Sequence, residues 1–435
     1  MSWCAEEFAD LDLRDKRLNE RAIKMMEDFA RQPMASIPAA CGGWAETQAA
    51  YRLLGNEKVH WQEILAPHWQ RSEERIATHP VVLCLQDTTE LDFHGQGIAG
   101  LGRLSYEAQR GMYLHPTYVV TPDREPLGVV DAWMWARADK DSPEAVAEGV
   151  RWREGYERVA ELAARVPQTR LVYVADREGD ILDLMQRAQT LGHPADWLIR
   201  SQHNRVLSDT GGKLWDQTVQ GKPLGTIQFT LGARPGQPAR QVQQEVWARR
   251  LTLAHGVTAT CLIAREIAPP EGIKALEWRL LTNREEIDFP SIATYIDWYR
   301  ARWEIELLFH IVKNACRVEA LQLSTIERLE RTIAMYLVVA WRIARLMRLG
   351  RTCPELPAEL FFTPEEWKGA YLLSKKPVPK QPPRLNEVIR MIAKLGGFLG
   401  RKGDGEPGVK TLWLGLQRIT DFAAGLDYAR AHGEL

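Results

Sequence analysis

"HPVVLCLQDTT" (residues 79–89) and "RLVYVADREGD" (residues 170–180) are two similar stretches that decide the fold. Each contains a continuous apolar run of strand length, which is typical of a strand buried on both faces. Asp87 and Asp176 come directly after these runs. Ligands of open α/β sheets bind beyond the carboxyl ends of the strands, so the two aspartates converge if the strands are neighbours. A single aspartate in such a place also often does no more than cap a turn.

The segments around these two strands follow a recognisable order. A hairpin joined by "TPDREP" and then a helix separate the strands, and Ser142 is the expected N-cap of this helix, with Pro143 at its first position. A helix capped by Asp180 and a strand "DWLIRS" follow the second strand. The expected elements are strands at 112–120 and 128–135, a helix from 142 to about 166, a helix from 181 to about 191, and a strand at 196–201. With a glutamate on a later helix, this is the order of a ribonuclease-H-like nucleotidyltransferase core.

That later helix is predicted from "YIDWYRARWEIELLFHIVK" at residues 295–313. At about 100° per residue, Tyr299, Arg302, Glu306 and Lys313 fall on one stripe of a continuous helix. A separate apolar stripe consists of Ile305, Leu308, Phe309, Val312 and Cys316. Any half-buried helix has a charged face, so the spacing alone does not establish a function.

Glu306 is the expected third carboxylate of a pocket that contains Asp87 and Asp176. Carboxylate oxygens on rigid elements suit Mg²⁺, for which Mn²⁺ can substitute, better than zinc. Two such ions activate one oxygen and stabilise the leaving oxygen during in-line displacement at phosphorus. The sequence therefore predicts a metal-dependent phosphoryl-transfer site.

We expect an α/β fold in three domains. Helical patterns cover residues 1–75 and 353–435, and the ribonuclease-H-like core occupies residues 76–352. Between about 203 and 285, short alternating segments with Gly and Pro turns predict an inserted antiparallel β subdomain. Amphipathic helices near the C-terminus, in "RLNEVIRMIAKLGGF" and "KTLWLGLQRITDFAAGLDYARAH", suggest an oligomerisation or docking element.

Composition excludes several classes of protein. The net charge of −1 over 435 residues excludes a small basic DNA-binding module, although local basic stretches such as "SKKPVPKQPPR" at 374–384 are compatible with DNA. The six cysteines show no zinc-ligand spacing. No apolar run is long enough to span a membrane, so we expect a cytoplasmic, reduced protein with no membrane partner.

The chain resembles the IS4-type, Tn5-like DDE transposases over nearly its full length. The residues Tyr299, Arg302, Glu306 and Lys313 match the family signature Tyr-(2)-Arg-(3)-Glu-(6)-Lys, and further similarity lies in "AYRLLGN", "QDTTELDF", "VADREGDI", "LIRSQH", "EWRLLTN" and "KLGGF". The resemblance implies a bacterial, nucleoid-associated DNA transposase that acts as a synaptic homodimer on double-stranded inverted-repeat ends and on target DNA. It also implies nicking, hairpin formation, hairpin opening and strand transfer, with the metal held by the three carboxylates.

The resemblance assigns DNA-binding roles to further residues. Tyr299, Arg302 and Lys313 would grip phosphates beside Glu306. Trp278 matches in position the residue that stacks on a flipped base, and Trp303 the one that enters the vacated stack. The resemblance also implies that Arg17, Arg21 and Arg200 contact the DNA of the transposon ends. A core position for either tryptophan and a solvated surface position for these arginines are the plain alternatives.

Two departures from the family pattern remove no expected ligand: Gln86 stands where relatives have an acid, and Gly179 replaces a small side chain in "DREGD". Two other functions stay open. A metal nuclease on the same core would keep the three carboxylates but would not need Trp278. A catalytically silent, DNA-binding derivative is disfavoured because clustered carboxylates near phosphate are unfavourable without a metal.

Overall fold

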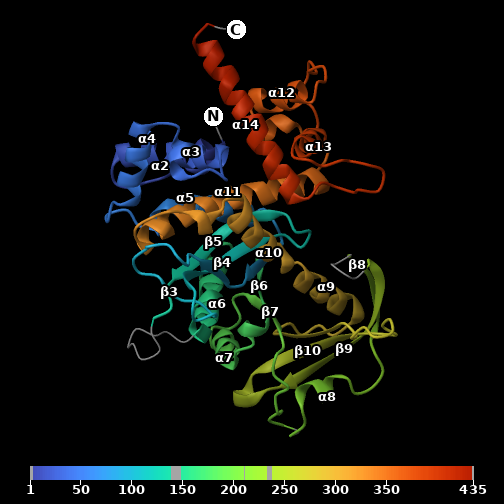
Figure 1. Ribbon diagram of the computed structural model, residues 1–435. Helices are drawn as coiled ribbons and strands as arrows, with labels where there is room; N and C mark the ends of the chain where they lie inside the picture. Colours follow the sequence, from blue (N-terminus) through green and yellow to red (C-terminus); the bar gives the residue numbers. More distant parts are fainter. Residues whose placement is uncertain (1–2, 139–147, 210, 233–237, 434–435) are drawn as a thin grey trace.

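The computed structural model describes residues 3–138, 148–209, 211–232 and 238–433. The expected helix start at Ser142 and Pro143 lies outside these residues, and the described helix, α6, spans Glu148–Arg165. Figure 1 shows three layers: N-terminal helices, the long helix α11 (Ile326–Thr352), and a large sheet beyond it.

The sheet is mixed, and its centre consists of β1 (Val81–Gln86), β6 (Arg170–Ala175) and β7 (Asp196–Arg200) in parallel. Antiparallel to β1 runs β4 (Arg110–Val120), which also pairs with β5 (Pro126–Trp135). The short strands β2 (Thr89–Asp92) and β3 (Gly102–Arg103) pair with the other part of β4. The predicted α/β core is confirmed, with α6 and α7 (Leu182–Thr190) among its helices.

The β-rich insertion continues this sheet. Its strands are β8 (Gly225–Leu231), β9 (Arg240–Thr252) and β10 (Thr258–Glu266), preceded by the short helix α8 (Leu214–Thr218). They are antiparallel, as predicted, but β11 (Glu277–Thr282) lies between β10 and β7 and pairs with both. The strand order β2-β4-β1-β6-β7-β11-β10-β9-β8 is therefore unbroken, which the alternating pattern did not predict.

The N-terminal helices share a hydrophobic core with α11. They are α1 (Trp3–Glu7), α2 (Lys16–Arg31), α3 (Ile37–Cys41), α4 (Trp44–Leu54) and α5 (Trp61–Ile76). Phe29 of α2 stacks on Tyr336 of α11, with ring centroids 4.8 Å apart. Arg331 of α11 donates hydrogen bonds to the carbonyl oxygen of Leu54, the last residue of α4, and to that of Val59, which lies between α4 and α5. These contacts join the first helical module to a helix late in the chain.

The C-terminal region consists of α12 (Pro364–Leu373), α13 (Leu385–Leu395) and α14 (Val409–Ala431). Helices α13 and α14 approach closely because Gly415 has no side chain: a Cβ there would lie 1.8 Å from the carbonyl oxygen of Ile392. The sequence predicted these two helices, whereas α12 was missed. Among the described helices, none has the length and apolar character needed to cross a membrane.

The continuous helix predicted for residues 295–313 is wrong. Helix α9 (Phe289–Arg300) ends at a turn of two residues, α10 (Trp303–His310) begins after it, and a π-helical turn follows at Ile311–Ala315. Both interruptions change the angle between successive side chains. Lys313, in the π-helical turn, pairs with Glu319 and leaves the inferred stripe, whereas Arg302 still reaches Glu306 and lies near Tyr299. The predicted apolar positions are nevertheless buried.

Candidate active site

The two strand-end aspartates lie at the same edge of the sheet. Strands β1 and β6 are parallel neighbours in which Gln86 is the register partner of Ala175, so Asp87 and Asp176 each follow one member of this pair. The expected adjacency of the two strands is confirmed. Asp176 also accepts a hydrogen bond of 2.8 Å from the backbone N–H of Glu178 and thereby caps a 3₁₀ turn. Asp176 therefore does cap a turn, which is the plain alternative to a role in metal binding.

Asp87 lies in an electrostatic cluster. Burial raises the pKa of its carboxyl to about 7; Arg302 opposes this shift, whereas the charges of Asp176 and Glu306 add to it. Its Oδ1 accepts a 2.8 Å hydrogen bond from the backbone N–H of Thr88. The charges of Asp176 and Glu306 thus lie close enough to Asp87 to influence its ionisation.

Arg302 supplies positive charge to this region. Arg302 lies at the turn between α9 and α10 and is only 6% exposed. One guanidinium nitrogen donates to Asp87, and another donates to Oε1 of Glu306 over 3.4 Å. The guanidinium therefore bridges two of the three residues that were predicted to bind a metal.

The residues fit a hard divalent cation in chemistry and charge, because the donor atoms are carboxylate oxygens that already surround a positive group. They are not assembled around one point. In the parts of the chain that the structure describes, no three acidic, histidine or cysteine side chains are close enough together to hold a metal ion. A cation that binds Asp87 must therefore share this carboxylate with Arg302 or displace the guanidinium from it.

Tyr299 and Arg200 lie near the same cluster. Tyr299 is 5% exposed, and burial raises the pKa of its hydroxyl, opposed by the charges of Arg302 and Arg200. Arg200 is half-buried at the end of β7. Lys313 is directed elsewhere: its Nζ lies 3.6 Å from Oε1 of Glu319, and that oxygen accepts a hydrogen bond from the backbone N–H of Asp92.

The two predicted base-contacting tryptophans have different environments. Trp303 is 60% exposed at the first position of α10, and the Arg302 guanidinium carbon lies 5.5 Å from the centre of its ring. Trp278 is half-buried on β11 and stacks on Phe229 of β8 at a centroid distance of 5.3 Å. Trp303 is therefore free to meet a ligand, whereas Trp278 already has one stacking partner.

Arg17 and Arg21 lie on α2 in the N-terminal module. Arg17 is exposed, Arg21 is half-buried, and both line a surface cavity of about 440 Å³ together with Lys24. Within the described parts of the chain, neither arginine forms a hydrogen bond or an ion pair with the Asp87 cluster. The lining of this cavity also includes the acidic residues Glu20, Asp28 and Glu46, so the surface around the two arginines is of mixed charge.

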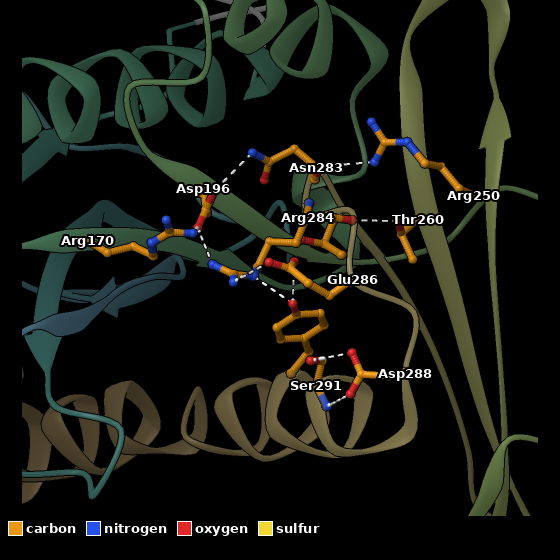
Figure 2. Close-up of polar contacts among 11 residues, drawn as sticks. Arg170, Asp196, Arg250, Thr260, Asn283, Arg284, Glu286, Asp288 and Ser291 are labelled. Carbon is orange, nitrogen blue, oxygen red and sulfur yellow. Dashed lines mark hydrogen bonds and ion pairs between the residues drawn. The ribbon is translucent and has the colours of Figure 1, made fainter.

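A polar network fixes the position of α9 relative to the sheet. Figure 2 shows Arg284, which follows β11, donating to Oδ2 of Asp196 on β7 over 2.7 Å. The same side chain donates to the Tyr295 hydroxyl on α9 over 2.7 Å, and this hydroxyl donates to Glu286. The helix that leads to Arg302 is therefore tied to a core strand by charged hydrogen bonds.

Asp180 does not cap α7 as we predicted. The N-cap residue is Ile181, and the buried Asp180 carboxylate accepts hydrogen bonds from the backbone N–H groups of Gln202 and His203. Arg205 donates to the same carboxylate over 2.6 Å. Asp180 thus holds the segment after β7 against the turn after β6, which local capping patterns cannot predict.

Sequence reasoning also missed a buried polar group beside Asp87. His115 of β4 has hydrogen-bond contacts with the side chains of Gln86 and Thr88, the two neighbours of Asp87 in the chain. A histidine within the apolar run "MYLHPTYVV" was the only signal available in the sequence.

Comparison with known families accounts for most of the chain. The segment at 1–59 matches the transposase DNA-binding model, 153–342 the transposase DDE domain, and 338–435 the transposase Tn5 dimerisation domain. The chain belongs to the Tn5-like DDE transposases of the IS4 family. Within this transposase, the DDE match contains Asp176 and the whole Arg302 region, while Asp87 lies before it.

The solved structures that match include a cryo-EM structure of the piggyBac transposase synaptic complex with hairpin DNA. The identity is 8% and the TM-score is 0.34, over 74% of this chain and 55% of the other. The transposase described here thus spans about half the length of that relative.

Proposed function

We propose that this transposase catalyses cut-and-paste transposition through Mg²⁺-dependent nicking, DNA hairpin formation, hairpin opening and strand transfer. The observation that carries the proposal is the meeting of Asp87, at the end of β1, with Arg302 and Glu306 from the α9–α10 junction. Asp176 lies at the end of the neighbouring parallel strand. The family match supports DNA phosphodiester chemistry at this edge of the sheet.

Asp87, Asp176 and Glu306 would hold the divalent metal, which DDE transposase domains generally use. When bound, the metal activates the attacking oxygen and stabilises the leaving oxygen at phosphorus. Mg²⁺ is the proposed ion because all three ligands are carboxylates, and Mn²⁺ would substitute.

Arg302 would bind a DNA phosphate as well as orient Asp87. A guanidinium can donate to several acceptors in a fixed fork, so a phosphate could share it with a carboxylate. Arg200 lies near enough to influence Tyr299 and would add positive charge on the same side. Tyr299 itself is too buried to bind DNA without a local movement, and Lys313 is held by Glu319. A phosphate contact by either residue would therefore require these local contacts to change.

Trp303 would enter the base stack when the DNA end bends, and its exposure beside Arg302 supports this role. Trp278 would receive the flipped base on the ring face that Phe229 does not cover. Arg17 and Arg21 would contact the inverted-repeat ends. Two copies would assemble on paired ends through the segment that matches the dimerisation domain.

The test is incubation of the purified transposase with duplex DNA that carries its flanking inverted repeats, with and without Mg²⁺. We expect nicked and then hairpin-ended products only with the metal. Glu306→Gln should lose at least about 100-fold in cleavage rate while it still binds end DNA in a mobility-shift assay. Metal-dependent cleavage without hairpins would indicate a nuclease instead, and DNA binding without cleavage would indicate a silent derivative.

A further inference from the structure

A chain of side-chain hydrogen bonds leads to Asp87 through the sheet. Nε2 of Gln86 donates to Thr117 Oγ1 over 2.7 Å, and Gln86 Oε1 lies 3.1 Å from His115 Nε2. His115 Nδ1 lies 2.8 Å from the hydroxyl oxygen of Thr88. Gln86 and Thr88 are on β1 and just after it, while the other two residues are on β4. The network thus joins β1, the strand that leads into Asp87, to the neighbouring strand β4.

The donor and acceptor roles of these groups are consistent along the whole hydrogen-bond network. With the Gln86 amide nitrogen on Thr117, the amide oxygen accepts from His115 Nε2–H, and His115 Nδ1 accepts from the Thr88 hydroxyl. Burial lowers the pKa of His115 to about 3, and this shift favours the neutral ring that the contacts on both nitrogens require. Each buried polar atom of the imidazole therefore has a partner.

Packing holds His115 in one position. The indole of Trp152 contacts the ring edge-on at 4.7 Å between centroids, and that of Trp133 does so at 5.9 Å. Gln86 is confined as well, because a Cβ on Gly155 of α6 would lie 2.1 Å from its Oε1. The network is thus anchored in a rigid part of the core, and Thr88 is its outer end.

We propose that His115 is a positioning residue that orients the Asp87 carboxylate through Thr88. The Thr88 hydroxyl is fixed by His115, and the Thr88 backbone N–H donates to Asp87 Oδ1 over 2.8 Å. An anchored Thr88 presents this N–H in a constant direction and leaves the other carboxylate oxygen for Arg302 or a metal. Outer hydrogen-bond partners of this kind commonly change metal affinity 10- to 100-fold, on the order of the effect expected here. The inference rests on the proposed metal-dependent function of Asp87.

The test replaces the hydroxyl without changing the shape of the side chain. Thr88→Val removes the group that contacts His115, Thr88→Ser keeps it, and Thr89→Val is the matched control at the next residue. Two quantities are measured: the Mg²⁺ concentration for half-maximal cleavage, and Mn²⁺ affinity from the electron paramagnetic resonance signal of the free ion. Asp87→Asn provides the reference for a lost ligand, and thermal melting shows that each variant is folded.

We expect Thr88→Val to raise the half-maximal Mg²⁺ concentration and the Mn²⁺ dissociation constant about 10-fold, with melting temperature and end binding little changed. Thr88→Ser and Thr89→Val should match wild type. In a His115→Ala background, provided it folds, Thr88→Val should add nothing, since both changes break the same contact. Unchanged metal affinity in Thr88→Val, or equal weakening in Thr88→Ser, would overturn the inference. Absence of cleavage by wild type would instead contradict the proposed function, and the Mn²⁺ measurement would still decide the role of His115.

Discussion

The Arg302 guanidinium donates a hydrogen bond to the Asp87 carboxylate across 215 residues of sequence. This contact closes the junction of α9 and α10 over the end of β1. Glu306 is bonded to the same guanidinium, so the positive charge of Arg302 acts on two of the proposed metal ligands. Arg302 is consequently the first residue to test.

Arg302→Ala should weaken DNA binding and reduce the dependence of log affinity on log salt concentration by about one unit, since one phosphate contact is lost. Fluorescence anisotropy with labelled end DNA between 50 and 200 mM salt, roughly the range in which such slopes are measured, checks this. Arg187→Ala is the control, because Arg187 lies on α7 and pairs with Glu157. An unaltered slope in Arg302→Ala would remove this residue from the phosphate contacts.

Trp303→Ala and Trp278→Ala should both impair hairpin formation, but only the second should affect stability. Trp303 is exposed, so its replacement should change the free energy of unfolding by less than about 0.5 kcal/mol. Trp278 loses its stacking on Phe229, which should cost about 1–3 kcal/mol. Denaturant unfolding and gel analysis of cleavage products measure the two effects. Normal hairpin yield in Trp278→Ala would leave this residue a structural role only.

Asp180→Asn should lower the free energy of unfolding by about 3 kcal/mol, because it leaves the largely buried Arg205 without its countercharge. Urea unfolding followed by circular dichroism measures the loss. Asp183→Asn serves as the control nearby in the first turn of α7, since the Asp183 side chain is 63% exposed, and it should lose less than about 1 kcal/mol. Equal losses in the two variants would contradict the buried-pair explanation.

Ionisation of Glu7 should make the free energy of unfolding depend on pH in the acid range. Burial alone would raise the pKa of Glu7, but the hydrogen bonds from His68 and Arg75 outweigh it and lower the pKa to about 2 from its ordinary value of 4.5. A depressed carboxyl pKa stabilises the fold above the unfolded value, and this contribution is lost as pH falls from about 4.5 toward 2. The difference in melting temperature between wild type and Glu7→Gln should therefore shrink across this window. The exposed neighbour in Glu6→Gln should show no such convergence.

The strand ends were predictable because β1 and β6 are buried on both faces, so their apolar runs are uninterrupted and Asp87 and Asp176 mark where they stop. The approach of Arg302 to Asp87 was not predictable, because it depends on a turn at Ala301 and no Gly or Pro in the sequence marks this turn. The shape of the helix carrying Glu306 was mispredicted for the same reason.

The sequence analysis also missed helix α12 and the pairing of β11 with β7, for different reasons. Helix α12 was missed although Thr363, Pro364 and Glu366 form a capping box with proline at the first position, a signal present in the sequence. The pairing of β11 with β7 had no such signal, because a register between distant segments is set by the sheet as a whole.

The bonds from Arg331 to the carbonyl oxygens of Leu54 and Val59 have a consequence for folding. Val59 and Arg331 are 272 residues apart, so these acceptors have no partner on a growing chain until α11 has been made. At about 5–20 residues per second, that interval lasts roughly 15 to 50 s. The first helices synthesised are thus among the last to complete their packing, and a fragment that stops before α11 should behave as a loosely ordered precursor.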